Sequence, residues 1–150
     1  MAGPTIREAV EDEVERVLGM YEWLFEPPGV VPPNWDPERA RAALGEAIRS
    51  EESTVLVAEN RGELLGFASA CLDLNSVRYG LRCWVEDLAV SPDHRSQGTG
   101  KALLEAAKDW ARERGATHLE LDSGEARHDA HRFYEREDPA WKGIQYTWVL

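Results

Sequence analysis

Residues 84–111 read WVEDLAVSPDHRSQGTGKALLEAAKDWA. The stretch begins as an apolar strand, 84–90, that carries two neighbouring acids. A polar turn with two glycines, 95–100, then leads into an amphipathic helix with apolar residues at Leu103, Ala107, Trp110 and Ala111. The glycines let a ligand approach the backbone, and the first N–H groups of the helix have no partner within the helix. This arrangement predicts an anion site suited to a diphosphate.

The spacing of the glycines excludes two common phosphate motifs. A Walker loop ends in Gly-Lys-Ser/Thr, whereas Gly100 and Lys101 are followed by Ala102. A dinucleotide fingerprint needs a third glycine, and this turn has only Gly98 and Gly100. What remains is Arg-x-x-Gly-x-Gly after a strand that reads Glu-Asp-Leu-Ala-Val-x-Pro. This combination resembles the central motif of the GNAT superfamily, the acetyl-CoA-dependent N-acetyltransferases, and the resemblance covers essentially the whole chain.

The composition indicates one globular domain over residues 1–150. The chain has 43% hydrophobic and 30% charged residues, with no long apolar run and no signal-like N-terminus. We therefore expect a cytoplasmic protein without membrane association, whose two cysteines, Cys71 and Cys83, are buried thiols. The net charge of -11 argues against nucleic acid as a partner and is compatible with a cationic small molecule. A solvated acidic surface would explain the same charge.

Hydrophobic periodicity predicts the elements around the motif. Strands are expected at 5–9, 54–59, 64–72, 84–90, 117–122 and 144–150, and helices at 10–25, 36–48, 100–114 and 123–134. The resemblance implies an α/β (α+β) fold with a mixed, mostly antiparallel sheet of six to seven strands flanked by about four helices. In this fold the strands 84–90 and 117–122 run parallel and splay apart, and the thioester enters the gap.

Two acids on the central strand suit acetyl transfer to an amine. An alkylammonium group has a pKa near ~10, so a carboxylate that accepts its proton would help. Because strand side chains alternate, only one of Glu86 and Asp87 should face the site. The resemblance to polyamine acetyltransferases favours Glu86 as the catalytic residue and leaves Asp87 a structural role. Alternatively, Glu86 only attracts the substrate or pairs with an arginine.

Further site residues follow from the resemblance. The segment 130–135 reads AHRFYE and matches a family helix, which makes Tyr134 the expected acid for the departing CoA thiolate. Alternatively, the hydroxyl of Tyr134 only hydrogen-bonds the CoA sulfur. The thioester carbonyl and pantetheine arm would lie along the backbone of Leu88, Ala89 and Val90. The remaining residues expected to bind acetyl-CoA are Arg95, Ser96, Gln97, Gly98, Thr99, Gly100 and Lys101. Arg127 stands where the family often has an asparagine that contacts CoA; it is expected to meet a phosphate of CoA instead, with exposure to solvent alone as the alternative.

The acceptor site is expected beside the first helix. Trp23 and Trp35, with the acids Glu22, Glu26 and Asp36, would bind an organic cation through aromatic rings and negative charge. Simple packing is the alternative for both tryptophans. The histidines and cysteines form no metal-ligand pattern, so no metal is expected. The chain is thus predicted to acetylate a primary amine of a small cationic metabolite by direct attack in a ternary complex. Alternatives are a protein or peptide N-acetyltransferase and a non-catalytic CoA-binding module; a homodimer is compatible with the resemblance.

One departure from the family pattern follows the tyrosine. The family has Glu-x-x-Gly-Phe, whereas residues 135–140 read EREDPA. Because the glycine and the aromatic residue are missing, we expect the C-terminal edge of the sheet to be shortened or shifted in register, and the acceptor pocket to change with it.

Overall fold

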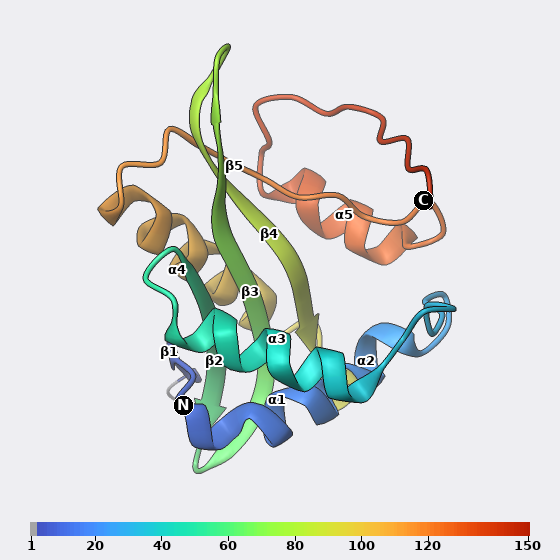
Figure 1. The fold of residues 1–150 in the computed structure, drawn as a ribbon. Helices are drawn as coiled ribbons and strands as arrows, with labels where there is room; N and C mark the ends of the chain where they lie inside the picture. The colour runs from blue at the N-terminus through green and yellow to red at the C-terminus, as the bar shows by residue number, and fades with distance from the viewer. Residues whose placement is uncertain (1–2) are drawn as a thin grey trace.

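The computed structural model describes residues 3–150, which form one sheet with helices on both faces (Figure 1). The strands lie in the order β1-β2-β3-β4-β5. Their bounds are Thr5–Glu8 for β1, Ser53–Asn60 for β2, Glu63–Ser76 for β3, Gly80–Val90 for β4 and His118–Glu120 for β5. The helices are α1 Val14–Met20, α2 Glu22–Phe25, α3 Pro37–Arg49, α4 Thr99–Glu113 and α5 His128–Arg136, with short 3-10 turns η1 Glu11–Glu13 and η2 Pro92–His94. The mixed, mostly antiparallel α/β fold is thereby confirmed.

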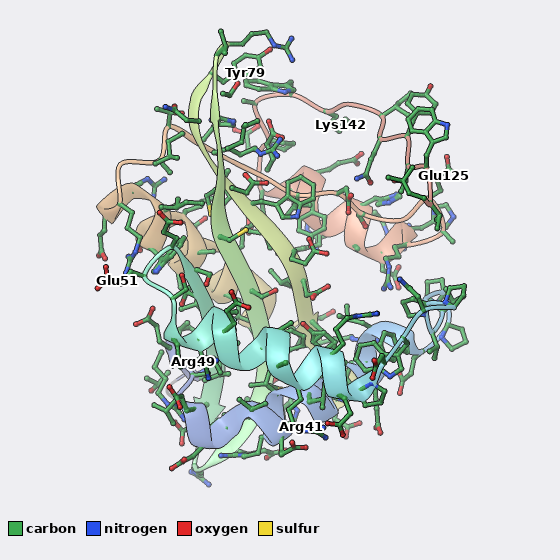
Figure 2. All side chains as sticks on the ribbon, viewed as in Figure 1. Arg41, Arg49, Glu51, Tyr79, Glu125 and Lys142 are labelled. Carbon is green, nitrogen blue, oxygen red and sulfur yellow. The ribbon has the colours of Figure 1, made fainter. Side chains whose placement is uncertain are left out.

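The first four strands form an antiparallel meander. β2 and β3 are joined at Arg61 and Gly62, whose φ values of 52° and 81° suit a type I′ hairpin turn. β3 and β4 pair from Gly66 opposite Val90 out to Ser76 opposite Gly80, so both strands are longer than predicted. Their hairpin projects beyond the rest of the sheet and carries Tyr79 at its tip (Figures 1 and 2).

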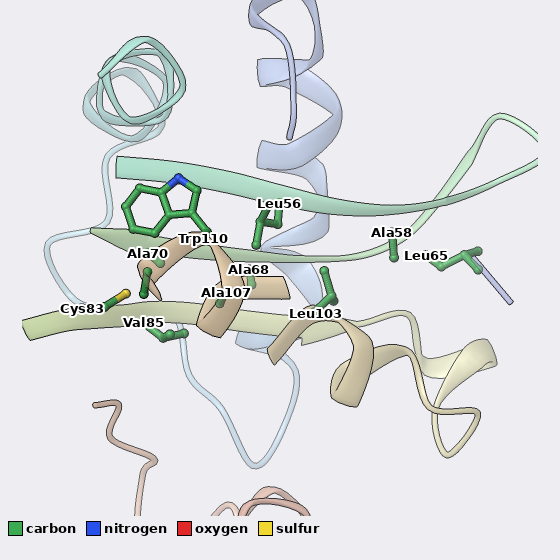
Figure 3. Packing of buried hydrophobic residues seen from close by; sticks show 11 residues of the cluster. Leu56, Ala58, Leu65, Ala68, Ala70, Cys83, Val85, Leu103, Ala107 and Trp110 are labelled. Carbon is green, nitrogen blue, oxygen red and sulfur yellow. The ribbon is translucent and has the colours of Figure 1, made fainter. Parts of the chain in front are cut away.

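Two hydrophobic layers hold the helices against the sheet. On one face, Leu103, Ala107 and Trp110 of α4 are at most 5% exposed and pack on strand residues such as Leu56 (Figure 3). On the other face, α1 and α3 cover a second cluster in which Phe67 is fully buried. Burial of these apolar side chains is the main contribution to the stability of the fold.

Local signals explain where the helices begin and end. The side chain of Asp36 accepts hydrogen bonds from the backbone N–H groups of Glu38 (3.0 Å) and Arg39 (3.4 Å), which makes it the predicted N-cap of α3. Gly115 follows α4 with a φ of 80°, as expected for a helix stop. The helix predicted over 10–25 is divided at Tyr21 into α1 and α2. The helix predicted from residue 123 corresponds to α5, which begins at His128.

β4 and β5 run parallel for only three residue pairs, Arg82–His118, Cys83–Leu119 and Trp84–Glu120. β4 then continues to Val90, and within residues 3–150 no strand pairs with it on that side. The predicted splay of a parallel strand pair is therefore confirmed, and it begins directly after Trp84.

The prediction of a final strand over residues 144–150 is wrong. No strand follows α5 in the part of the chain that the structure describes, so the sheet has five strands instead of six to seven. After α5, Asp138 adopts a left-handed φ of 59°, and the chain continues without regular structure. Two contacts hold this segment: the ring of Trp141 lies 5.4 Å from that of Tyr79, and Lys142 Nζ lies 3.0 Å from a carboxylate oxygen of Glu135. A strand forms only beside a hydrogen-bonding neighbour, and 144–150 has none here.

The two cysteines are free thiols on neighbouring rungs of the β3–β4 ladder. Cys83 is buried in the core beneath α4, as expected. The expectation that Cys71 is also buried is wrong: it is only half-buried, because it lies opposite Trp84 and borders the groove described below. The thiols therefore face opposite sides of the sheet. None of the helices in residues 3–150 has the length and apolar character needed to cross a membrane.

Candidate active site

A β-bulge in β4 places two carboxylates on one face of the sheet. Ser69 of β3 lies opposite Asp87 and Ala70 lies opposite Val85, so Glu86 is the extra residue. Glu86 and Asp87 consequently line the same groove, while Val85 packs into the core on the opposite face. The expectation that only one of the two acids faces the site is wrong, because the bulge interrupts the alternation of side chains.

The groove lies between α3 and the strands β3 and β4 and has a volume of about 410 Å³. One wall is made of small apolar residues of α3, and the rest combines acids with aromatic rings. Its lining includes Ala40, Ala43 and Ala47 of α3, the acids Asp36, Glu86 and Asp87, and the rings of Tyr21 and Trp35. An apolar groove with a few converging acids suits a small organic cation.

Asp87 is held by Tyr21 at the inner end of the groove. The hydroxyl of Tyr21 donates a hydrogen bond of 2.7 Å to a carboxylate oxygen of Asp87. Burial raises the pKa of Asp87, and the hydrogen bond from Tyr21 opposes this rise. Burial, with the negative charge of Asp87, also raises the pKa of Tyr21, so its hydroxyl stays protonated and remains a donor. Asp87 is therefore a fixed carboxylate within reach of the groove.

Glu86 stands in a different environment. Its side chain is exposed, and one carboxylate oxygen accepts a hydrogen bond of 2.7 Å from the indole N–H of Trp84. The guanidinium of Arg82 lies 5.4 Å from the centre of the Trp84 ring, and this cation–π contact helps to hold the indole in place. Glu86 is thus oriented by Trp84 and open to water, whereas Asp87 is half-buried and hydrogen-bonded to Tyr21.

The aromatic wall is built around Tyr21. Its ring stacks on Phe67 at 4.9 Å and on Trp35 at 6.0 Å, and Trp35 packs edge-on against Phe25 at 4.8 Å. Of the residues expected at the acceptor site, Trp35 and Asp36 line the groove. Trp23 packs against the core cluster beneath α1 and α3 instead, and Glu26 is exposed at the end of α2.

The glycine turn before α4 has the geometry of an anion cradle. Gly98 is the N-cap of α4 with a φ of 84°, and Ser96 also has a positive φ, 61°. A Cβ added at Gly100 would approach Phe133 and Val90 no closer than 3.6 Å, an ordinary contact, so packing within the chain does not require glycine there. The free N–H groups of the first turn and an uncrowded glycine fit the diphosphate of CoA. Arg95 closes the turn through a hydrogen bond of 3.2 Å to the carbonyl of Val90.

Tyr134 lies on α5 beside a second, larger space. This C-terminal hollow has a volume of about 1590 Å³ and is lined by residues 116–125, by Leu104 and Lys108 of α4, by Trp84 and Tyr134, and by residues 137–145. Burial raises the pKa of Tyr134, while the positive charge of Arg127 opposes the rise. The phenol therefore keeps its proton near neutral pH and is available as a donor.

Arg127 is the N-cap residue of α5 and contacts α2. One guanidinium nitrogen donates a hydrogen bond of 2.9 Å to the carbonyl of Leu24, which ties the start of α5 to α2. Its charge also lowers the pKa of Asp87 against the effect of burial. Lys101, at the start of α4, lies 3.8 Å from a carboxylate oxygen of Glu137. The positive charge of Arg127 thus acts on both Asp87 and Tyr134.

Sequence reasoning missed Tyr21 as a site residue. Its position on the apolar face of the first helix indicated packing, and only its hydroxyl distinguished it from the other ring positions. The groove-facing role of Asp87 was missed for a different reason, the bulge. In residues 3–150 no three His, Cys, Asp or Glu side chains gather closely enough to hold a metal ion.

Comparison with known proteins agrees with this geometry. Residues 17–137 match the model of the acetyltransferase (GNAT) family. The chain is 39% identical over 89 residues to the uncharacterized N-acetyltransferase YhdJ of Bacillus subtilis, covering 59% of this chain and 63% of that protein. It is 37% identical over 83 residues to the streptothricin acetyltransferase of Streptomyces lavendulae, covering 55% of this chain and 42% of that protein.

A solved structure shows the same fold. An aminoglycoside N-acetyltransferase in complex with CoA superimposes with a TM-score of 0.82 over 97% of this chain and 93% of its own, at 18% sequence identity. The family match covers most of the chain, and the splayed parallel strands and glycine turn are present in the structure. The chain therefore belongs to the GNAT family of acetyltransferases, a family of acyl-transferring enzymes.

Proposed function

We propose that this protein transfers the acetyl group of acetyl-CoA to a primary amine of a small cationic molecule, by direct attack in a ternary complex. The observation that carries the proposal is the bulge of β4, which turns Glu86 and Asp87 together into a groove walled by Tyr21 and Trp35. Two carboxylates beside aromatic rings attract an ammonium group and orient it next to the splay of β4 and β5.

Acetyl-CoA would be held by the glycine turn and the unpaired edge of β4. Residues 95–101 would bind the diphosphate, and the backbone of Leu88, Ala89 and Val90 would hold the pantetheine arm and the thioester carbonyl. When bound, acetyl-CoA supplies an activated acetyl group on a thiolate leaving group. Arg127, which the structure sets beside Leu24, is proposed to act on the charges of the acceptor site instead of on the diphosphate.

Proton transfer is assigned to Glu86 and Tyr134. Glu86 is the carboxylate open to water, so it accepts a proton from the ammonium group, directly or through a water molecule, and passes it to solvent. The free amine attacks the thioester carbon, the C–S bond breaks, and the CoA thiolate takes the phenolic proton of Tyr134. The nitrogen of the new amide loses its extra proton, which returns the Tyr134 phenolate to its neutral form directly or through water. Asp87, fixed by Tyr21, supplies the negative charge that holds the amine in the groove.

Two named relatives support a small-molecule acceptor. One carries the name streptothricin acetyltransferase, and the solved structure of similar fold is an aminoglycoside N-acetyltransferase. Both names refer to small amine-bearing molecules. The groove of about 410 Å³, with three acids in its lining, agrees with an acceptor of that kind.

Release of the CoA thiol tests this function across a panel of polyamines, aminoglycosides, aminoalkylphosphonates, amino acids and short peptides. We expect turnover with small cationic amines, a fall in kcat/KM of about 100-fold or more in Glu86→Gln, and a similar fall in kcat in Tyr134→Phe. Glu51→Gln is the matched control, because this acid is exposed at the far end of α3 (Figure 2). Turnover with peptides alone, or an unchanged kcat/KM in Glu86→Gln, would overturn the proposal.

A further inference from the structure

The carboxylate of Glu86 depends on one neighbouring side chain for its orientation. Within residues 3–150, its hydrogen bond of 2.7 Å from the indole N–H of Trp84 is the only one that its side chain makes. An exposed glutamate side chain without a partner samples many rotamers. The direction in which Glu86 points therefore depends on how firmly the indole is held.

Trp84 is held in turn by Arg82. Nε and one terminal nitrogen of Arg82 donate hydrogen bonds of 2.9 and 2.8 Å to the two carboxylate oxygens of Asp73, and the other terminal nitrogen donates one of 3.3 Å to Glu120. This two-point pairing fixes the plane of the guanidinium, which lies 5.4 Å from the centre of the Trp84 ring. The side chain of Arg82 is only 26% exposed, and a cation–π contact is stronger where water is partly excluded.

These contacts cross three strands of the sheet. Asp73 belongs to β3, Arg82 and Trp84 belong to β4, and Glu120 belongs to β5 (Figure 1). Trp84 and Glu120 form the last pair of the parallel β4–β5 ladder, directly before the splay. The contacts of Arg82 therefore brace the last closed rung of the sheet, and Glu86 follows two residues later, in the bulge.

The two acids on Arg82 also keep its charge away from Glu86. An ion pair with an arginine stabilises a charged carboxylate and makes it a weaker base. Arg82 directs its hydrogen bonds to Asp73 and Glu120 instead, and in the described part of the chain it forms no ion pair with Glu86. Glu86 receives only the neutral indole donor, which orients the carboxylate without cancelling its charge.

We infer that Arg82 is a positioning residue for acetyl transfer, which holds the Glu86 carboxylate toward the acceptor groove through the indole of Trp84. This inference rests on the proposed role of Glu86 as the proton acceptor. Neither Arg82 nor Trp84 lines the groove, so their effect on the reaction passes through Glu86. Asp73 and Glu120 contribute by fixing the guanidinium.

Kinetics in two backgrounds test the inference. Arg82→Gln and Trp84→Phe should each lower kcat/KM about 10- to 100-fold, because a small displacement of a catalytic group reduces the rate by that order. In a Glu86→Gln background the same two substitutions should have no further effect, since residues that act as a unit are not additive. An equal fall in both backgrounds would show a general structural effect and would overturn the inference.

A spectroscopic measurement needs no substrate. The indole N–H resonance of Trp84, identified among the six tryptophans by its loss in Trp84→Phe, should shift with pH in the wild type as Glu86 takes up a proton. This shift should be absent in Glu86→Gln and strongly reduced in Arg82→Gln. Titration of the acids bound to Arg82, or of Cys71 opposite Trp84, would persist in Glu86→Gln and is thereby separated. A shift retained in full in Arg82→Gln would contradict the inference.

Arg7→Gln is the matched control. The guanidinium of Arg7 also joins two acids, with hydrogen bonds of 2.7 Å to Glu59 and of 2.8 Å to both carboxylate oxygens of Glu13, and its side chain is 33% exposed. It belongs to β1, at the opposite edge of the sheet from β5. Arg7→Gln should lower the urea midpoint about as much as Arg82→Gln but leave kcat/KM unchanged. A fall in kcat/KM as large as in Arg82→Gln would overturn the inference.

The outcomes separate this inference from the proposed function. If Glu86→Gln keeps the wild-type kcat/KM, the proposed role of Glu86 is wrong and the inference is wrong with it. If Glu86→Gln lowers kcat/KM but Trp84→Phe and Arg82→Gln do not, only the inference is wrong. Should Arg82→Gln fold poorly by circular dichroism, Trp84→Phe decides the kinetic test, because it keeps an aromatic ring and removes the indole N–H.

Discussion

Removing the hydroxyl of Tyr21 isolates the interaction that fixes Asp87 in the groove. In Tyr21→Phe the ring keeps its stacking on Phe67 (4.9 Å) and Trp35 (6.0 Å), and only the hydrogen bond of 2.7 Å to Asp87 is lost. A hydrogen bond to a charged group contributes about 1.5–3 kcal/mol, and one to a neutral group about 0.5–1.5 kcal/mol. We therefore expect the variant to lose about 1.5–3 kcal/mol of unfolding free energy where Asp87 is ionised, and less where it is protonated.

The pH dependence follows from the raised pKa of Asp87. The folded protein holds this proton more tightly than the unfolded chain does, so unfolding releases it. The contribution of Asp87 to stability consequently falls as the pH rises from the ordinary aspartate pKa of about 3.9 through the raised value. Without the Tyr21 hydroxyl the pKa of Asp87 rises further, so the stability difference between wild type and Tyr21→Phe widens with increasing pH.

Urea denaturation at pH 4 and pH 8 measures this difference. With a slope of about 1–3 kcal/mol per molar urea, the midpoint at pH 8 should fall by roughly 1 M. Tyr79→Phe is the matched control: its ring is exposed at the hairpin tip, and its effect should stay within about 0.5 kcal/mol at both pH values. An equal loss at pH 4 and pH 8, or a loss below about 0.5 kcal/mol at pH 8, would refute the role given to the Tyr21–Asp87 hydrogen bond.

Two further predictions concern the glycine turn and a buried ion pair. Gly98→Ala should destabilise the protein by about 1–2 kcal/mol because its φ is 84°, whereas Gly100→Ala should leave the unfolding free energy within about 0.5 kcal/mol and raise the KM for acetyl-CoA. Denaturation and steady-state kinetics separate the two effects, and an unchanged KM in Gly100→Ala would exclude close approach of the diphosphate. Hydrogen bonds from Arg7 lower the pKa of Glu13 from 4.5 to about 2, so the stability that this carboxylate contributes is present above pH 4.5 and is lost as the pH falls toward about 2. In Glu13→Gln the unfolding free energy should therefore change less with pH between these two values than in the wild type. An unchanged pH dependence would show that the ion pair does not contribute to stability.

Elements with local signals could be predicted from the sequence. The Asp36-Pro37 pair marks the start of α3, because an N-cap carboxylate and a proline at the first position need no long-range partner. The turn that ends at Gly98 was recognised for the same reason, since its positive φ is a local requirement. In both cases the residues that decide the conformation lie within a few positions of it.

Features that depend on pairing between distant segments were not predictable in this way. The extra residue at Glu86 is defined by the register of β4 against Ser69 and Ala70 of β3, which the strand's own composition does not specify. The strand-like composition of 144–150 predicted a strand that the structure does not form, because a strand needs a neighbour and the chain anchors this segment away from β5. Tyr21 was missed because a tyrosine on an apolar helix face serves packing and hydrogen bonding alike.

The shortness of β5 leaves room beside β4 for the proposed reaction. Because pairing stops at Trp84–Glu120, the edge of β4 from Val85 to Val90 is free for a thioester. A longer β5 would pair with β4 beyond Trp84 and would satisfy the backbone groups that the proposed thioester and pantetheine arm need. The early end of β5 at Glu120 is therefore the structural condition on which the proposed binding of acetyl-CoA depends.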